Sequence, residues 1–180
     1  MKHKNFLAAL LLSPVMVMAG TVKSPNGNIV VNFSVDQQGR PTYDMTYKGQ
    51  AVVKPSHLGL QLAHDKHASK GLKETDLMTG FTIKKEETKT FDETWRPVWG
   101  ETATIRNHYN EYAATLTQST EQRTIISRFR VYDDGIGFRY EFPQQKELNY
   151  FLIKEEMTEF DMTGDHKAWW LPGDYDTQEQ

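Results

Sequence analysis

Apolar and polar residues alternate with a period of two along most of this chain. In residues 28–35 the apolar side chains of Ile29, Val31 and Phe33 stand two positions apart, and residues 123–132 repeat the pattern. Successive side chains of a β-strand point to opposite faces, so this alternation predicts strands with one buried face. No segment carries the continuous apolar stripe of a three-turn helix.

Turn residues separate the alternating segments. Gln37-Gln38-Gly39, Lys48-Gly49 and Asp133-Asp134-Gly135 each predict a turn, and glycine at the last of these would accept a positive φ. Residues 64–75 are polar and mixed, and they predict a loop or an irregular strand. The predicted strands are residues 28–35, 41–47, 51–53, 58–62, 79–84, 101–106, 109–118, 123–132, 136–142, 149–154 and 158–162. Turn signals about every eight to twelve residues favour an all-β sandwich or barrel.

The N-terminus has the pattern of a secretory signal. Lys2 and Lys4 precede an apolar run at residues 6–12, and Ala19 ends a plausible cleavage site. We therefore expect a signal peptide at residues 1–19 and export to the periplasm. The apolar run is too short to span a bilayer core of ~30 Å as a helix. The chain has no cysteine, which excludes disulfides and a lipidated cysteine, so we expect no membrane anchor.

Charge and aromatic content narrow the possible partners. The formal net charge of −3 becomes more negative once Lys2 and Lys4 are removed, and no basic stripe remains. We therefore expect no nucleic-acid binding. Aromatic residues make up 12% of the chain, with four Trp and eight Tyr. They suit a large core, a sugar-stacking surface or an aromatic domain interface, and the sequence leaves all three open.

The chain lacks the common catalytic motifs. It has no glycine-rich phosphate loop, no GxSxG and no HExxH. His64 and His67 would share a metal only on a helix, which the surrounding residues do not predict. Glycoside hydrolysis needs two carboxylates flanking the bond. The candidates are Asp92, Glu93, Glu155, Glu156, Glu159 and residues 174–179, each of which also suits a solvated surface.

The sequence predicts that two arginines form structural ion pairs. Arg128 and Arg130 share one face of the predicted strand at residues 123–132. We expect them to pair with carboxylates such as Glu155 or Glu156.

The end of the chain is aromatic and acidic. Trp169, Trp170 and Leu171 precede a cluster of carboxylates at residues 174–179. We expect such an apolar end to meet a further domain. Three carboxylates within six residues also suit a hard cation such as Ca²⁺, although the spacing is not that of an EF-hand.

An ordered series of motifs resembles a known family. The motifs are Ser24-Pro25-Asn26-Gly27, Gly39-Arg40-Pro41-Thr42-Tyr43, Ser56-His57-Leu58-Gly59-Leu60, Phe91-Asp92-Glu93-Thr94-Trp95, Val98-Trp99-Gly100-Glu101, Arg106-Asn107-His108-Tyr109-Asn110-Glu111, Phe129-Arg130-Val131-Tyr132-Asp133-Asp134-Gly135, Gly137-Phe138-Arg139-Tyr140-Glu141-Phe142, Trp169-Trp170 and Asp174-Tyr175-Asp176. The set resembles the N-terminal domain of glycoside hydrolase family 97. The resemblance covers essentially the whole chain after the predicted signal.

The resemblance implies a fold and a role. Residues 20–180 would form an all-β super-sandwich of mostly antiparallel strands, similar to galactose mutarotase. A catalytic (β/α)8 barrel of the same polypeptide would follow Gln180 and hold the acid and the base or nucleophile, so this chain would hold no catalytic residue. The family's sandwich donates one late Glu to a Ca²⁺ ion beside the substrate, and Glu179 best matches that position.

The family also implies a substrate, with alternatives left open. The complete enzyme would be a periplasmic α-glucosidase that removes terminal α-linked glucose from maltooligosaccharides, or a related α-galactosidase. The α-linked oligosaccharide would then be a partner of the whole protein, and the chain alone would be inactive. A stand-alone carbohydrate-binding β-sandwich and a purely structural domain are the alternatives.

Overall fold

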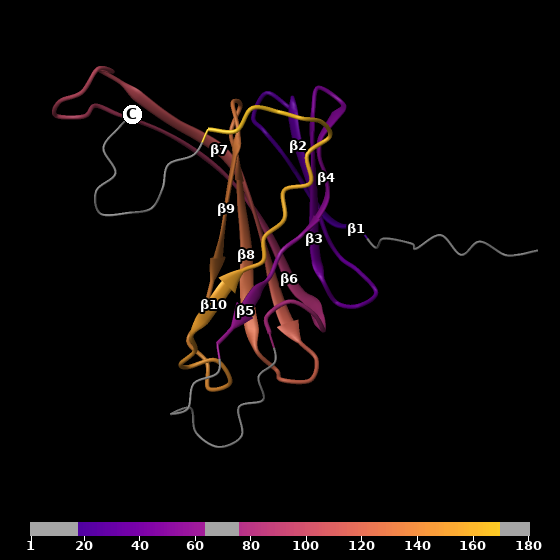
Figure 1. The fold of residues 1–180 in the computed structure, drawn as a ribbon. Coiled ribbons are helices and arrows are strands. Elements are labelled where there is room, and N and C mark those ends of the chain that lie inside the picture. The colour runs from indigo at the N-terminus through magenta and orange to yellow at the C-terminus, as the bar shows by residue number, and fades with distance from the viewer. Residues whose placement is uncertain (1–17, 64–75, 170–180) are drawn as a thin grey trace, which may run out of the picture.

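The computed structural model describes residues 18–63 and 76–169, which form strands and connecting segments without a helix. Two four-stranded antiparallel sheets lie against each other (Figure 1). The first sheet holds β1 (Met18–Lys23), β2 (Ile29–Val35), β3 (Pro41–Tyr47) and β4 (Gln50–His57). The second holds β6 (Phe81–Trp95), β7 (Ile105–Gln118), β8 (Thr124–Val131) and β9 (Ile136–Glu141). A small third sheet pairs β5 (Leu60–Leu62) with β10 (Ile153–Glu156). The predicted all-β sandwich is confirmed.

The core lies between the two large sheets. Phe33 from β2 and Tyr43 from β3 contact Phe129 of β8, with ring centroids 5.8 and 5.7 Å apart. Phe138 of β9 joins them at 5.9 Å from Phe129. Phe129 is fully buried, and the alternating apolar residues of β2 and β8 face this cluster as the sequence predicts. Aromatic burial of this size dominates the hydrophobic stabilisation of a small domain.

Glycine is required at two turns and not at a third. Lys48 and Gly49 both have positive φ, 50° and 78°, as a two-residue type I′ hairpin needs. Gly39 has φ 73°, and a Cβ there would lie 2.5 Å from the backbone nitrogen of Phe81. By contrast, Gly135 does not have a positive φ, so that detail of the predicted Asp133-Asp134-Gly135 turn is wrong.

Residues 157–163 close one side of the sandwich. Their backbone pairs with β4, where Lys54 donates to the Asp161 carbonyl at 2.8 Å and Glu159 donates to the His57 carbonyl at 2.9 Å. The hydroxyl of Tyr43 also donates to the Glu159 carbonyl at 2.9 Å. The predicted strand at 158–162 is reduced to a single bridge between Val53 and Met162, and the strand predicted at 149–154 is shifted to β10.

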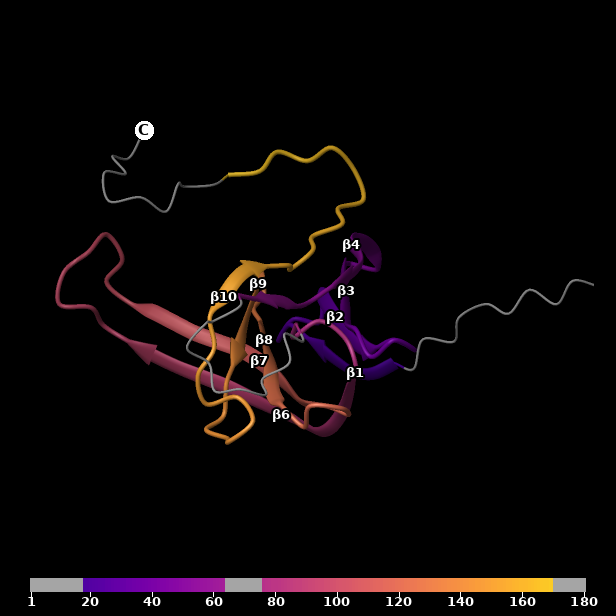
Figure 2. The same ribbon diagram turned by 60° about the horizontal axis from the view of Figure 1, so that its bottom comes forward.

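The β6–β7 hairpin is far longer than the sequence predicts. Its antiparallel pairing runs from Phe81 opposite Gln118 to Trp95 opposite Ile105, with one register shift between Ile83 and Lys85. The prediction ended the first strand at residue 84 and split the second into two. Figures 1 and 2 show the distal half of the hairpin projecting beyond the sandwich. We call this half, residues 88–110, the arm. It is held by cross-strand hydrogen bonds more than by burial, which is why apolar alternation does not reveal its full extent.

The predicted signal peptide falls mostly outside the described residues, and it stays a prediction. β1 begins at Met18, so it overlaps the last two residues of the predicted signal. In the parts of the chain that the structure describes, no helix is long and apolar enough to cross a membrane.

Candidate functional site

The outer face of the second sheet carries a network of ion pairs. The Arg128 guanidinium lies between two carboxylates, with Nη1 2.5 Å from Glu111 Oε1 and Nε 2.7 Å from Glu141 Oε1. Arg130 Nε donates to Glu111 at 2.9 Å, and Arg139 Nε donates to Glu141 at 2.8 Å. The side chains of Glu111 and Arg128 are only 9% and 18% exposed, so the centre of the network is nearly buried.

The partners of the two arginines differ from those predicted. Glu155 and Glu156 lie on β10 in the small sheet and are exposed. Arg128 and Arg130 instead meet carboxylates of the strands on either side of β8, because Glu111 stands opposite Arg130 and Glu141 stands opposite Ile126, diagonal to Arg128. Cross-strand register therefore decides the pairing.

The network keeps its carboxylates ionised. Hydrogen bonds from Arg128 and then Arg139 lower the pKa of Glu141 to about 2. Burial acts to raise the pKa of Glu111, but the hydrogen bonds from Arg130 and Arg128 outweigh it and the net shift is downward. Neither carboxyl group is suited to donate a proton near neutral pH, so the network is structural.

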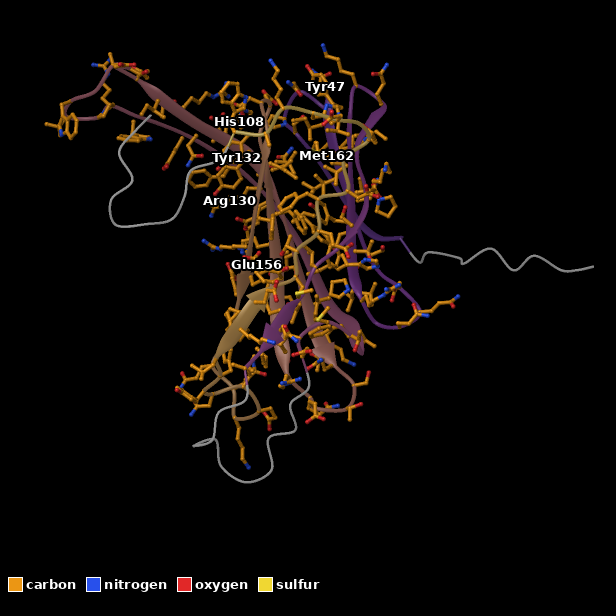
Figure 3. The ribbon with its side chains drawn as sticks, viewed as in Figure 1. Tyr47, His108, Arg130, Tyr132, Glu156 and Met162 are labelled. Carbon is orange, nitrogen blue, oxygen red and sulfur yellow. The ribbon has the colours of Figure 1, made fainter. Side chains whose placement is uncertain are left out.

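Aromatic rings continue this face toward the arm (Figure 3). Phe91 stacks on Tyr109 with ring centroids 5.2 Å apart and an interplanar angle of 25°. Tyr132 contacts the same tyrosine at 5.1 Å, and Arg130 places its guanidinium carbon 4.6 Å from the Tyr109 ring centre. The sequence analysis did not predict this cluster. Phe91 and Trp95 are four positions apart, which puts both on one face of a strand, and this spacing could have indicated an aromatic surface.

The candidate carboxylate Asp92 lies on the face of the arm opposite the aromatic rings, and it has a partner on that same face. Arg106 donates to both of its oxygens, at 2.8 and 2.7 Å. This hydrogen bonding lowers the pKa of Asp92. Both side chains are about half exposed, so the pair orders the arm more than it stabilises the domain.

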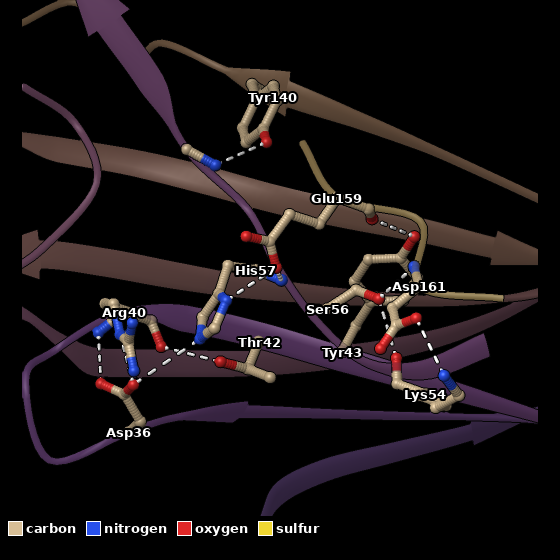
Figure 4. Close-up of polar contacts among 11 residues, drawn as sticks. Asp36, Arg40, Thr42, Tyr43, Lys54, Ser56, His57, Tyr140, Glu159 and Asp161 are labelled. Atoms are coloured by element: carbon tan, nitrogen blue, oxygen red, sulfur yellow. Dashed lines mark hydrogen bonds and ion pairs between the residues drawn. The ribbon is translucent and has the colours of Figure 1, made fainter. Parts of the chain in front are cut away.

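A second candidate, Glu159, fastens residues 157–163 to β4 (Figure 4). Its Oε2 accepts a hydrogen bond from the His57 backbone at 2.8 Å and lies 2.7 Å from His57 Nδ1. Those contacts lower the pKa of Glu159, with the backbone hydrogen bond as the largest cause. On the other side of the imidazole, Asp36 lies 3.9 Å from Nε2 and pairs with Arg40 at 2.6 Å. Glu159 therefore holds residues 157–163 against β4.

Two hollows in the described surface hold none of the predicted catalytic candidates. A polar hollow of about 280 Å³ lies between β1 and the β6–β7 hairpin and is lined by Lys23, Lys89 and Glu111 among others. A mostly apolar hollow of about 390 Å³ is lined by Ile29, Met45, Tyr47, Val52, Asp133, Asp134, Gly135 and Ile136. Neither pairs two of the carboxylates that the sequence singled out, so the described residues do not assemble the predicted chemistry there.

The predicted metal ligand lies outside the described residues. Glu179 belongs to the undescribed end, together with the rest of the acidic cluster at 174–179, Trp170 and Leu171, and His64 and His67 fall in the undescribed internal segment. Within residues 18–63 and 76–169, no group of three or more His, Cys, Asp or Glu side chains could hold a metal ion. The assignment of Glu179 to Ca²⁺ stays a prediction. Trp169, the last described residue, is 92% exposed.

The described residues thus form an antiparallel β-sandwich with an ion-pair network on the outer face of its second sheet. The family model of the glycosyl hydrolase 97 N-terminal domain matches residues 22–180. The chain therefore belongs to the N-terminal domain family of glycoside hydrolase family 97, as its motifs indicate.

Similar proteins are much longer than this chain. A retaining α-galactosidase of Bacteroides thetaiotaomicron is 28% identical over 145 residues, which is 78% of this chain and 19% of that protein. A glycoside hydrolase family 97 enzyme of Pseudoalteromonas sp. strain K8, solved in complex with panose and with acarbose, is 35% identical with a TM-score of 0.72. The match covers 85% of this chain and 22% of the enzyme. A β-arabinopyranosidase at 21% identity and TM-score 0.67 shares the fold.

Proposed function

We propose that this chain is the N-terminal, non-catalytic domain of an exported α-glycosidase. In this proposal it packs on a (β/α)8 catalytic barrel of the same polypeptide. The complete enzyme hydrolyses terminal α-linked glucose in maltooligosaccharides, in the periplasm. α-Galactosidase activity is the close alternative, since one similar protein has that activity.

The family match over residues 22–180 is the observation that carries this proposal. Two further facts support it. The chain spans about a fifth of the length of the similar enzymes, so most of such an enzyme, including a separate catalytic domain, lies beyond the matched part. Two of the carboxylates that the sequence singles out are engaged in other contacts, Asp92 with Arg106 and Glu159 with His57. Export rests on Lys2, Lys4 and the apolar run that follows them.

The purified 180-residue chain should have no glycosidase activity. Catalysis of this kind needs two positioned carboxyl groups, and the proposal places both in the barrel. The measurement is release of nitrophenol from p-nitrophenyl α-glucoside and α-galactoside, with the Bacteroides thetaiotaomicron α-galactosidase as the positive control for the galactoside. Turnover that co-purifies with the folded chain would refute the proposal.

Calcium should bind this chain weakly, through Glu179 at most. Ca²⁺ prefers six to eight oxygen ligands, and one carboxylate cannot fill that shell. Titration of the chain with Ca²⁺ in a calorimeter should give a Kd no tighter than about 1 mM, the range of weak sites. Glu179→Gln should remove the remaining heat while Glu156→Gln leaves it unchanged. Micromolar binding, or binding that survives Glu179→Gln, would contradict the assignment.

A stand-alone carbohydrate-binding module is a second candidate. It is favoured by Trp99 and Tyr150, which are 88% and 60% exposed in the described part of the chain. Exposed aromatic rings stack on sugar rings. A saturable change of tryptophan fluorescence with maltooligosaccharides, lost in Trp99→Ser, would support this alternative over an accessory domain.

A further inference from the structure

The arm has two faces of different chemistry. Cross-strand pairing sets Phe91 opposite Tyr109 and Trp95 opposite Ile105. The alternate positions set Asp92 opposite His108 and Thr94 opposite Arg106. Side chains on one strand alternate between faces, so the first set shares one face, with the Glu93–Asn107 pair between its two apolar pairs, and the second set lies on a polar face. We call the first set, Phe91, Trp95, Ile105 and Tyr109, the apolar arm face.

Three of the four side chains of this face are exposed, whereas Tyr109 is buried at 5% exposure. Trp95, Phe91 and Ile105 are 48%, 38% and 36% exposed, and the loop at the tip adds Val98 and Trp99, which are 99% and 88% exposed. Large apolar side chains gathered on a projecting hairpin are unusual for a soluble monomer, which keeps most of them covered. Trp and Tyr are also the residues that dominate binding energy at protein interfaces.

The polar face keeps the arm ordered without a partner. Arg106 binds Asp92 through two hydrogen bonds, and Thr90 donates to Asn110 at 2.7 Å. At the base, Asn110 donates to the Lys23 carbonyl of β1 at 2.8 Å, which ties the arm to the first sheet. A surface that is already ordered loses little conformational entropy on binding.

The base of the apolar arm face merges with the ion-pair network. Arg130 contacts the Tyr109 ring and also binds Glu111 at 2.9 Å. Its side chain is 38% exposed, so part of the guanidinium faces outward beside the rings. Aromatic residues with an adjoining arginine are enriched at protein–protein interfaces, whereas a surface that only needs solubility favours Lys and Glu.

We propose that the apolar arm face docks on the catalytic domain of the enzyme, as a second contact distant in sequence from the aromatic residues near the chain end. This proposal rests on the proposed function. The catalytic domain is the expected partner because the similar enzymes extend far beyond the matched region, which covers only 22% of the Pseudoalteromonas enzyme. In both ribbon views the last described segment, drawn in yellow, leaves the sandwich on the side of the arm (Figures 1 and 2).

The test measures binding of the whole 180-residue chain to the catalytic region of the Pseudoalteromonas enzyme, produced without the part that matches this chain. The arm variant is Trp95→Ser with Ile105→Ser. The control is Thr88→Ser with Thr94→Ser, which changes two threonines on the polar face of β6. Near-ultraviolet circular dichroism and thermal unfolding first establish that all three chains keep the same core.

The arm variant should bind at least about tenfold more weakly than the unchanged chain, because loss of one interface hot spot has this size. The control should bind within about twofold. Equal binding by the arm variant and the unchanged chain would overturn the docking assignment while the proposed function stands. Failure of the unchanged chain to bind the catalytic region would also overturn the docking assignment, while the proposed function, which is carried by the family match, would stand.

The same variants separate other occupants. If sedimentation finds a dimer that only the arm variant loses, the face binds a second copy of this chain and the docking proposal fails. If maltooligosaccharides bind the unchanged chain and not the arm variant, the face is a sugar-binding surface and the proposal fails as well.

Discussion

Replacement of Phe129 by alanine should lower the free energy of unfolding by about 3–5 kcal/mol, the usual cost of removing a buried phenylalanine. Phe129 is fully buried in β8 and contacts Phe33, Tyr43 and Phe138 at centroid distances between 5.7 and 5.9 Å. These rings come from both large sheets, so the cavity would lie at the centre of the sandwich. Urea unfolding followed by circular dichroism measures the change.

The chain offers a matched control for this variant. Phe160 contacts Tyr43 and Phe138 of the same cluster but is 59% exposed. Phe160→Ala should therefore cost less than about 1 kcal/mol, since solvent already reaches the ring. Similar losses for the two variants would mean that the two sheets do not pack around Phe129 as described.

Replacement of Arg128 by methionine should cost about 3 kcal/mol, because removing one partner strands the other charges of a nearly buried network. Glu111, whose side chain is 9% exposed, would keep only Arg130, and Glu141 would keep only Arg139. Arg139→Met is the control. Its side chain is 60% exposed, so its loss should cost less than about 1 kcal/mol.

The same network makes stability depend on acid. The pKa of Glu141 is about 2 in the folded chain against an ordinary value of 4.5. A lowered folded pKa means that the unfolded chain binds the proton first, so the contribution is complete above pH 4.5 and is lost as the pH falls toward 2. Glu141→Gln should flatten the acid limb of the unfolding free energy in this window.

Two outcomes would contradict this account of the network. One is an acid limb that Glu141→Gln leaves unchanged. The other is equal destabilisation by Arg128→Met and Arg139→Met. That result would mean that the free-energy cost of losing an arginine of the network does not depend on how exposed its side chain is. Chemical unfolding at a series of pH values measures both results.

Several local features were predictable from the sequence. β3 occupies residues 41–47 as predicted, and β8 and β9 differ from their predicted bounds by one residue at most at each end. These strands alternate apolar and polar residues beside a core and end at turns, and both signals are local. Lys48-Gly49 adopts the positive φ angles of the predicted hairpin. The family motifs are also short, local stretches of sequence, and the family match confirms the resemblance that they indicate.

The sequence did not reveal features that depend on cross-strand pairing. Residues 85–95 are rich in charge, so alternation ended the predicted strand at residue 84, but pairing with β7 extends it to Trp95. The partners predicted for Arg128 were wrong for the same reason. Which carboxylates it meets depends on the register of β7, β8 and β9.

The sequence by itself determined that this chain forms β-strands in which apolar and polar residues alternate, that it belongs to its family and that it is rich in aromatic residues. Only the tertiary structure decided which aromatic residues form the core around Phe129 and which remain exposed on the arm. The physical reason is that alternation specifies the two faces of each strand, whereas the packing of the sheets specifies which face another part of the same chain covers.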